Sequence, residues 1–146
     1  MSPARVSSHR TRVGAGRSVS FTARLPRDRT TPAAARRLVR KRLARHLPVE
    51  TMDDVLLVVS ELATNALVHG SGDIELRIAF DGRRVTGAVA DTGTGFTRAP
   101  REQPHTRIGG NGLYLVERLA TRWGVHEGTA QVWFEIPRRR CAPATG

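Results

Sequence analysis

The chain has 146 residues, 39% of them hydrophobic, which is enough for one domain with a buried core. Its formal net charge of +11 comes almost wholly from arginine, and a single cysteine, Cys141, excludes an intrachain disulfide framework and a cysteine metal site. We find no signal-peptide pattern and no apolar run of membrane-spanning length, so we expect a cytoplasmic protein with no membrane partner.

The first elements in chain order are a tail and a strand. Residues 1–17 are rich in Ser, Gly and Arg and lack large apolar side chains, which is typical of a disordered basic tail. Residues 18–24 alternate apolar and polar side chains, and this alternation predicts a half-buried strand.

Two helices are predicted next. Thr31 followed by Pro32 resembles an N-cap with proline at the first helical position, and the apolar stripe continues to about His46. A second helix is predicted to begin near Thr51, as its cap, and to end at Gly70.

The second half of the chain predicts strands, a long loop and one helix. The predicted strands are residues 74–80, 85–91, 123–126 and 130–136, and the predicted helix is 110–121. Asp81 and Gly82 predict a tight turn between the first two of these strands, whereas residues 92–107 have the composition of a lid-length loop. The element order predicts one α+β domain over 18–138, with helices on a single face of one sheet, and a C-terminal tail over 139–146.

A carboxylate and an amide lie four residues apart in the second predicted helix, in the segment ELATNALVH. That spacing puts Glu61 and Asn65 on one helical face, with Cβ atoms about 5–6 Å apart. An Asn oxygen suits Mg²⁺, and a neighbouring Glu can accept a proton from an attacking hydroxyl. The ordinary structural alternative is a solvated Glu and an Asn that caps the helix near Gly70.

Asp91 ends a strand in the segment DTGTGF. A partly buried carboxylate there needs a hydrogen-bond donor, and the exocyclic amine of adenine is a suitable one. Gly93 and Gly95 would let the backbone pass close to a base and sugar. The alternative is a strand-ending turn followed by an ordinary glycine loop.

A glycine run, GGNGL, opens the last predicted helix. Backbone N–H groups at such a helix start can hold phosphate oxygens, although no Walker lysine follows. As the alternative, the glycines only let a long loop turn into a helix.

These three segments, in this order, resemble the N, G1 and G2 boxes of the GHKL (Bergerat-fold) ATPase and kinase superfamily. Within it, the chain resembles the small anti-sigma-factor serine kinases, from about residue 18 to 137. The resemblance implies a two-layer α/β sandwich with a mixed, mostly antiparallel sheet, and it implies ATP and Mg²⁺ as cofactors.

The resemblance also implies roles for individual residues. Glu61 would be the catalytic base, Asn65 the magnesium ligand, and Asp91 the acceptor of the adenine amine. The remaining nucleotide-binding positions would be Gly93, Gly95, Arg107, Gly109, Gly110, Asn111, Gly112, Leu113 and Thr129. One departure is Gln131, which stands where the group carries a threonine near the adenine.

The function implied is a protein serine/threonine kinase that phosphorylates an anti-sigma-factor antagonist and binds a sigma factor. A homodimer is implied by the resemblance alone. The alternative is a catalytically silent regulator that binds ATP and sequesters its partner.

Two other classes of protein fit the sequence less well. A nucleic-acid binder is suggested by the basic face of residues 36–45, but no aromatic platform or nucleic-acid motif accompanies it, so we expect no direct nucleic-acid binding. A sensor histidine kinase would need a dimerising helical hairpin before the ATP domain, and residues 1–17 do not predict one.

Overall fold

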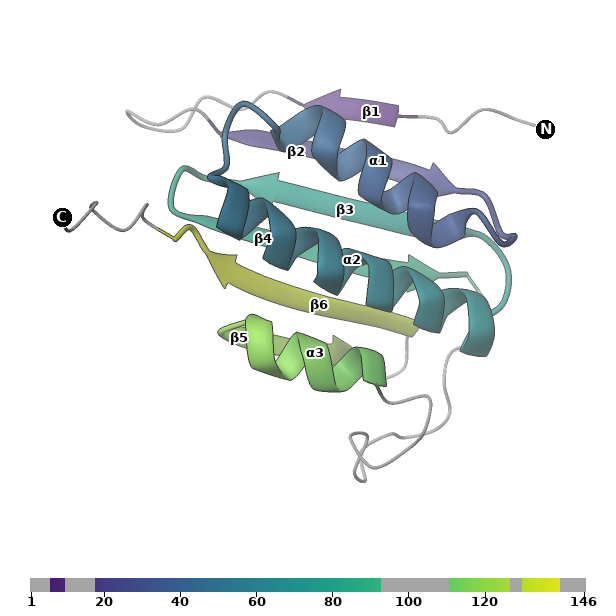
Figure 1. Cartoon of the computed structure of the whole chain (residues 1–146). Coiled ribbons are helices and arrows are strands. Elements are labelled where there is room, and N and C mark those ends of the chain that lie inside the picture. The colour runs from purple at the N-terminus through teal and green to yellow at the C-terminus, as the bar shows by residue number, and fades with distance from the viewer. Residues whose placement is uncertain (1–5, 10–17, 93–110, 127–129, 140–146) are drawn as a thin grey trace, which may run out of the picture.

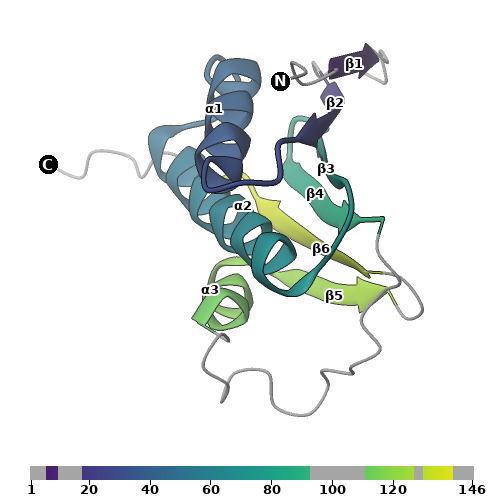
Figure 2. The same cartoon turned by 90° about the vertical axis from the view of Figure 1, so that its right-hand side faces the viewer.

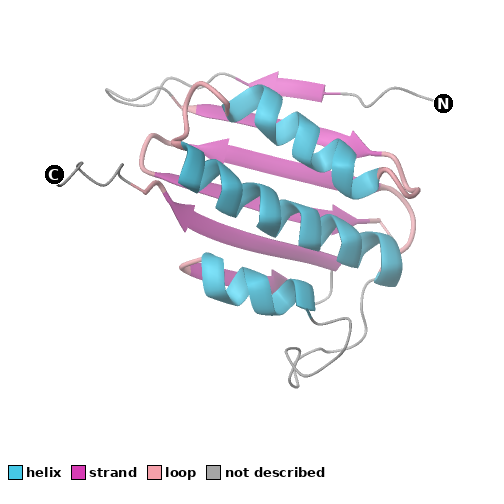
Figure 3. Ribbon diagram, in the orientation of Figure 1, coloured by secondary structure: helices cyan, strands magenta, loops and turns pink. Residues whose placement is uncertain are grey.

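The computed structural model describes residues 6–9, 18–92, 111–126 and 130–139, which form two layers. One layer is a six-stranded sheet, and the other consists of helices that cover one face of that sheet (Figures 1 and 3). The predicted α+β sandwich is therefore confirmed.

All neighbouring strands of the described sheet are antiparallel, so no parallel pair supports the mixed sheet that was expected. The strand order is β1-β2-β3-β4-β6-β5. The strands are β1 (Val6–His9), β2 (Val19–Leu25), β3 (Ile74–Phe80), β4 (Arg84–Asp91), β5 (Arg122–His126) and β6 (Ala130–Pro137). The strand β1 was not expected: the prediction of a disordered tail is wrong for these four residues, which pair with β2.

Three helices lie side by side on the sheet. They are α1 (Thr31–Leu43), α2 (Val49–His69) and α3 (Asn111–Leu119). Viewed along the layers in Figure 2, α2 lies between α1 and α3. The middle helix therefore has one flank toward each neighbour.

The core lies between the helices and the sheet. Alternate residues of β3, including Ile74 and Leu76, point toward the helices and are fully buried, as the period of a strand requires. Val55, Val59 and Leu62 of α2 meet them at helical spacing. Burial of each such side chain stabilises the fold by about 1.5–3 kcal/mol, so the register of α2 over the sheet is strongly specified.

Both helix starts differ from the prediction. The N-cap of α1 is Thr30, and Thr31 is the first helical residue, whose buried hydroxyl donates to the Asp28 carbonyl at 2.7 Å. The N-cap of α2 is Pro48, so Thr51 lies inside the first turn. Its hydroxyl is fully buried and accepts a hydrogen bond from the Arg139 backbone at 2.8 Å. A tertiary contact thus uses the side chain that the sequence suggested as a cap.

The predicted turn between β3 and β4 is confirmed. Gly82 has φ +97°, a conformation that glycine adopts without strain. The Asp81 carboxylate accepts hydrogen bonds from the backbone N–H groups of Arg84 and Arg83, at 2.9 and 2.8 Å. These two bonds lower the pKa of the Asp81 carboxyl. The turn sets the register that brings the far end of β4 beside the end of α2.

Candidate functional site

The second half of α2 carries Glu61 and Asn65, both half-buried. Leu62 and Ala66, one residue after each of them, are buried against the sheet. With about 3.6 residues per turn, the two polar side chains therefore lie beside the core stripe, on one flank of the helix. This agrees with the common face predicted from their spacing.

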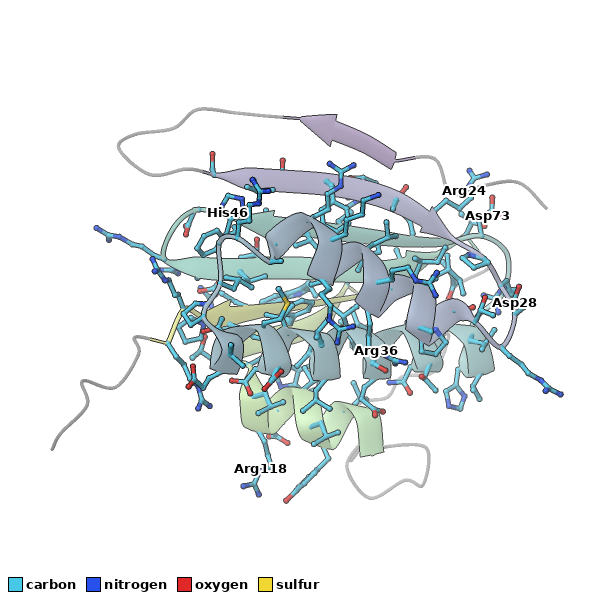
Figure 4. All side chains as sticks on the ribbon, turned by 45° about the horizontal axis from the view of Figure 1, so that its top comes forward. Arg24, Asp28, Arg36, His46, Asp73 and Arg118 are labelled. Carbon is cyan, nitrogen blue, oxygen red and sulfur yellow. The ribbon has the colours of Figure 1, made fainter. Side chains whose placement is uncertain are left out.

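The flank that carries Glu61 and Asn65 faces away from α1. Ser60 marks the opposite flank, because its hydroxyl accepts a hydrogen bond at 2.6 Å from Arg36 of α1, which is labelled in Figure 4. The Glu61 and Asn65 side chains consequently face α3. Within the part of the chain that the structure describes, neither side chain makes a hydrogen bond or an ion pair. Both remain available to a ligand at the edge of the helix.

Asp91 ends β4 on the face of the sheet that the helices cover. It is paired with Ile74 on one side and Ala130 on the other, and its Oδ2 atom is buried. Alternation along β4 gives Asp91 the same direction as buried Val89 and Val85. The carboxylate is thus directed toward the C-terminal end of α2.

Gly70 is the residue that lets this carboxylate approach the helix. A Cβ atom at Gly70 would lie 1.9 Å from Asp91 Oδ2 and 2.7 Å from the Ala66 carbonyl oxygen, so no side chain fits. The sequence indicated Gly70 only as a helix stop. Its second role depends on a contact between residues far apart in the chain, which no local pattern reveals.

The turn between α2 and β3 is bonded to the end of β4. The backbone N–H of Asp73 donates to the Thr92 hydroxyl at 2.9 Å, and the Thr92 N–H donates to the Asp73 carbonyl at 3.0 Å. Asp91 therefore has the turn beside it and α2 in front of it. The two segments that carry Asn65 and Asp91 form a single corner of the molecule.

Several predicted site residues fall outside the described structure. They are Gly93, Gly95, Arg107, Gly109, Gly110 and Thr129. Asn111 and Gly112 form the first turn of α3, and Leu113 is half-buried and packs against the core. The predicted helix start is confirmed within one residue.

Gln131 lies away from this corner. It pairs with Ala90 and with His126, so alternation puts it on the open face of the sheet, opposite to the face of Asp91. The residue of β6 that pairs with Asp91 is Ala130. The expected position of Gln131 near the adenine is therefore wrong in this structure.

A comparison with protein-family models gives a match that covers most of this fold and the corner described above. Residues 25–136 match the family model described as a histidine kinase-like ATPase domain. The chain belongs to this family. The match runs from the end of β2 into β6, and it includes Glu61, Asn65 and Asp91. A comparison with curated proteins found no match.

Membership of this ATPase-domain family implies that the chain binds ATP. The donor set at the corner fits a nucleotide with its Mg²⁺, because an amide oxygen and a carboxylate flank the edge of α2 and Mg²⁺ takes few protein ligands.

No group of three or more His, Cys, Asp or Glu able to hold a metal occurs in the described ranges. Even α2, the longest helix described, is not long and apolar enough to cross a membrane.

Proposed function

We propose that this GHKL ATPase domain is a protein serine/threonine kinase of the anti-sigma-factor type. It would transfer the γ-phosphate of Mg-ATP to a hydroxyl of a small antagonist protein and would also sequester a sigma factor. The observation that supports the proposal is the contact between the end of α2 and Asp91 at Gly70, because it brings the segments of the proposed metal ligand, Asn65, and the proposed adenine acceptor, Asp91, into one corner.

Each side chain of the corner has a role that suits its surroundings. Asp91, directed at the helix layer from the end of β4, would accept the adenine amine and refuse guanine, which carries a carbonyl at that position. Asn65 would hold Mg²⁺ through its amide oxygen. Mg²⁺ held there would neutralise charge on the phosphate oxygens during the transfer.

Glu61 lies about one turn before Asn65 on the same flank. There it would orient the substrate hydroxyl and accept its proton as the new P–O bond forms and the bond between the γ-phosphorus and the leaving ADP breaks. Backbone N–H groups at the start of α3 would meet phosphate oxygens, because the N-terminal end of a helix favours negative charge.

The partners rest on the resemblance of the three motifs to the anti-sigma-factor kinases. The fold supports ATP chemistry, but it does not identify the protein substrate, which depends on the site and its surroundings. The antagonist and the sigma factor are therefore the part of the proposal that most needs a direct test.

The test is incubation of the protein with labelled ATP, Mg²⁺ and candidate antagonist proteins, with Glu61→Ala as the control. We expect label on a serine or threonine of one antagonist with the wild type and none with the variant. If ATP binds but no label is transferred, the protein is a stoichiometric ATP-dependent regulator and the kinase proposal is wrong. If a sigma factor fails to co-purify with the ATP-bound protein, sequestration is wrong.

A further inference from the structure

The loop between β2 and α1 contributes an arginine to the end of α2. The guanidinium of Arg27 donates three hydrogen bonds, from Nε to the Gly72 carbonyl at 2.6 Å, from Nη1 to the Leu67 carbonyl at 3.1 Å and from Nη2 to the Ala66 carbonyl at 3.2 Å. The side chain is half-buried. One planar group thus joins the last turn of α2 to the turn that follows it.

The acceptors of Arg27 lie at and just beyond the end of α2: the Leu67 carbonyl belongs to the last turn, the Ala66 carbonyl also accepts the Gly70 N–H at 3.0 Å, and the Gly72 carbonyl follows the helix. The last four carbonyls of an α-helix lack intrahelical partners, and a cation at this end also suits the helix dipole. The fork of guanidinium donors matches several acceptors in fixed positions, whereas an ammonium group is a point charge. Lysine at position 27 would therefore keep the charge and lose part of the bonding.

The segment that Arg27 holds is the one that Asp91 contacts. Gly70 lies between the carbonyls of Leu67 and Gly72, and its Cα faces the Asp91 carboxylate. On the far side, two hydrogen bonds between Asp73 and Thr92, one of them to the Thr92 hydroxyl, attach the same turn to β4. Arg27 and Thr92 therefore determine where the turn lies relative to Asp91.

We propose that Arg27 is a positioning residue for adenine nucleotide. It acts through the end of α2, where it sets the distance between Asn65 and Asp91. Asn65 precedes Ala66, whose carbonyl Arg27 binds, and Asp91 contacts Gly70. Its hydrogen bonds are to the backbone of α2 and of the following turn, so it acts without touching the reacting atoms. The inference rests on the proposed ATP site and adds a residue to it.

Two other arginines supply matched controls. Arg24 forms an exposed ion pair with Asp73 at 3.4 Å, in the same turn that Arg27 holds (Figure 4). Arg36 bonds Ser60 in the middle of α2, away from its C-terminal end. Arg24→Ala removes the same charge, and Arg36→Ala removes a similar bond to the same helix. We expect neither to change nucleotide affinity, because neither sets the end of α2 against Asp91.

The experiment is calorimetric titration of the full chain with Mg-ATP and with Mg-GTP, below the unfolding temperature of every variant. We expect Arg27→Ala to weaken ATP binding about tenfold, because several bonds from a charged donor are lost, and to reduce the preference for ATP over GTP. Arg27→Lys should give an intermediate value for both quantities. A residue that only stabilised the fold would lower the unfolding temperature without changing the ATP-to-GTP ratio.

The outcomes separate this inference from the proposed function. If the wild type binds ATP and Arg27→Ala binds it with unchanged affinity and selectivity, the positioning role is wrong and the ATP site stands. If Arg27→Ala does not fold, Arg27→Lys decides, and wild-type affinity with wild-type selectivity in that variant overturns the inference. If the wild type itself does not bind ATP, the proposed function fails and the positioning role fails with it.

Discussion

The two flanks of α2 differ in how their polar side chains are used. On the flank toward α1, Ser60 is bonded to Arg36, and at the C-terminal end of the helix the carbonyls of Ala66 and Leu67 are bonded to Arg27. On the flank toward α3, Glu61 and Asn65 have no hydrogen-bond partner among the residues described. One side of the helix is attached to the fold, and the other presents polar groups at its surface.

This difference indicates that one flank of α2 holds the helix in place, whereas the other carries the groups proposed to react. A half-buried amide or carboxylate without a protein partner is only partly hydrated. A hydrogen bond from such a group to a ligand therefore costs little desolvation and favours binding. Bonds on the other flank hold the helix still while that happens. The same comparison predicts which substitutions damage activity and which damage only stability.

The largest effect is expected on the α3-facing flank, from Glu61→Gln. Glutamine keeps the size of the side chain but cannot accept a proton, so phosphoryl transfer should fall by about 10²–10⁴-fold. Affinity for Mg-ATP should stay close to that of the wild type. Single-turnover kinetics measure the first quantity and calorimetry the second. Equal activity of the two proteins would remove Glu61 from the reaction.

Asn65→Ala should come next, with a loss of about 10–100-fold in affinity for Mg-ATP, because the amide oxygen proposed to hold the metal is removed. The matched control is Ser60→Ala on the opposite flank. It loses the bond to Arg36 and should lower the free energy of unfolding by about 1 kcal/mol without changing ATP affinity. Equal ATP affinity in the two variants would contradict the division between the flanks.

The contact of α2 with the sheet is tested by Gly70→Ala. The added Cβ would lie 1.9 Å from Asp91 Oδ2, so the carboxylate or the turn must move. We expect a loss of about 1–3 kcal/mol in the free energy of unfolding, together with weaker ATP binding. Denaturant unfolding and an ATP titration of the same sample measure both. Retention of full affinity would show that Asp91 can shift without consequence.

The smallest effect is expected at Asp54, which lies about two turns before Glu61 on the same flank and has a protein partner, Arg139, at 3.2 Å. Burial raises the pKa of the Asp54 carboxyl above its usual value of 3.8, and Arg139 opposes that rise. The folded state therefore binds this proton more tightly than the unfolded chain does. The resulting stabilisation is present below the usual pKa and is lost as pH rises through the folded-state pKa.

Asp54→Asn should remove this pH dependence. The free energy of unfolding of the wild type, measured relative to the variant, should fall as the pH rises from about 3 to about 6. ATP affinity should not change, because the carboxylate is engaged by Arg139. A difference of the opposite slope would mean that the ion pair outweighs burial.

The sequence predicts much of the fold because its signals are local. The alternation of β3 and the apolar spacing of α2 depend only on neighbouring residues, and both elements form where the patterns indicate them. The helix starts were less accurate. Thr51 resembled a cap, but its hydroxyl bonds Arg139, a residue distant in the chain.

The candidate site was only partly visible in the sequence. The order of the three motifs indicated ATP chemistry, and the spacing of Glu61 and Asn65 indicated a shared flank. Arg27 had no signal, because it is one arginine among many and its acceptors are backbone carbonyls. The face occupied by Gln131 also could not be read locally, since a shift of one residue in the register of a strand reverses every side chain.

By itself, the sequence determined which chemical groups this GHKL ATPase domain carries and in what order, because residue type and periodicity are properties of short segments. Only the tertiary structure decided that Gly70 meets Asp91, that Arg27 holds the end of α2 and that Glu61 and Asn65 face α3. These contacts join segments far apart in the chain, and they depend on how the helices pack on the buried face of the sheet.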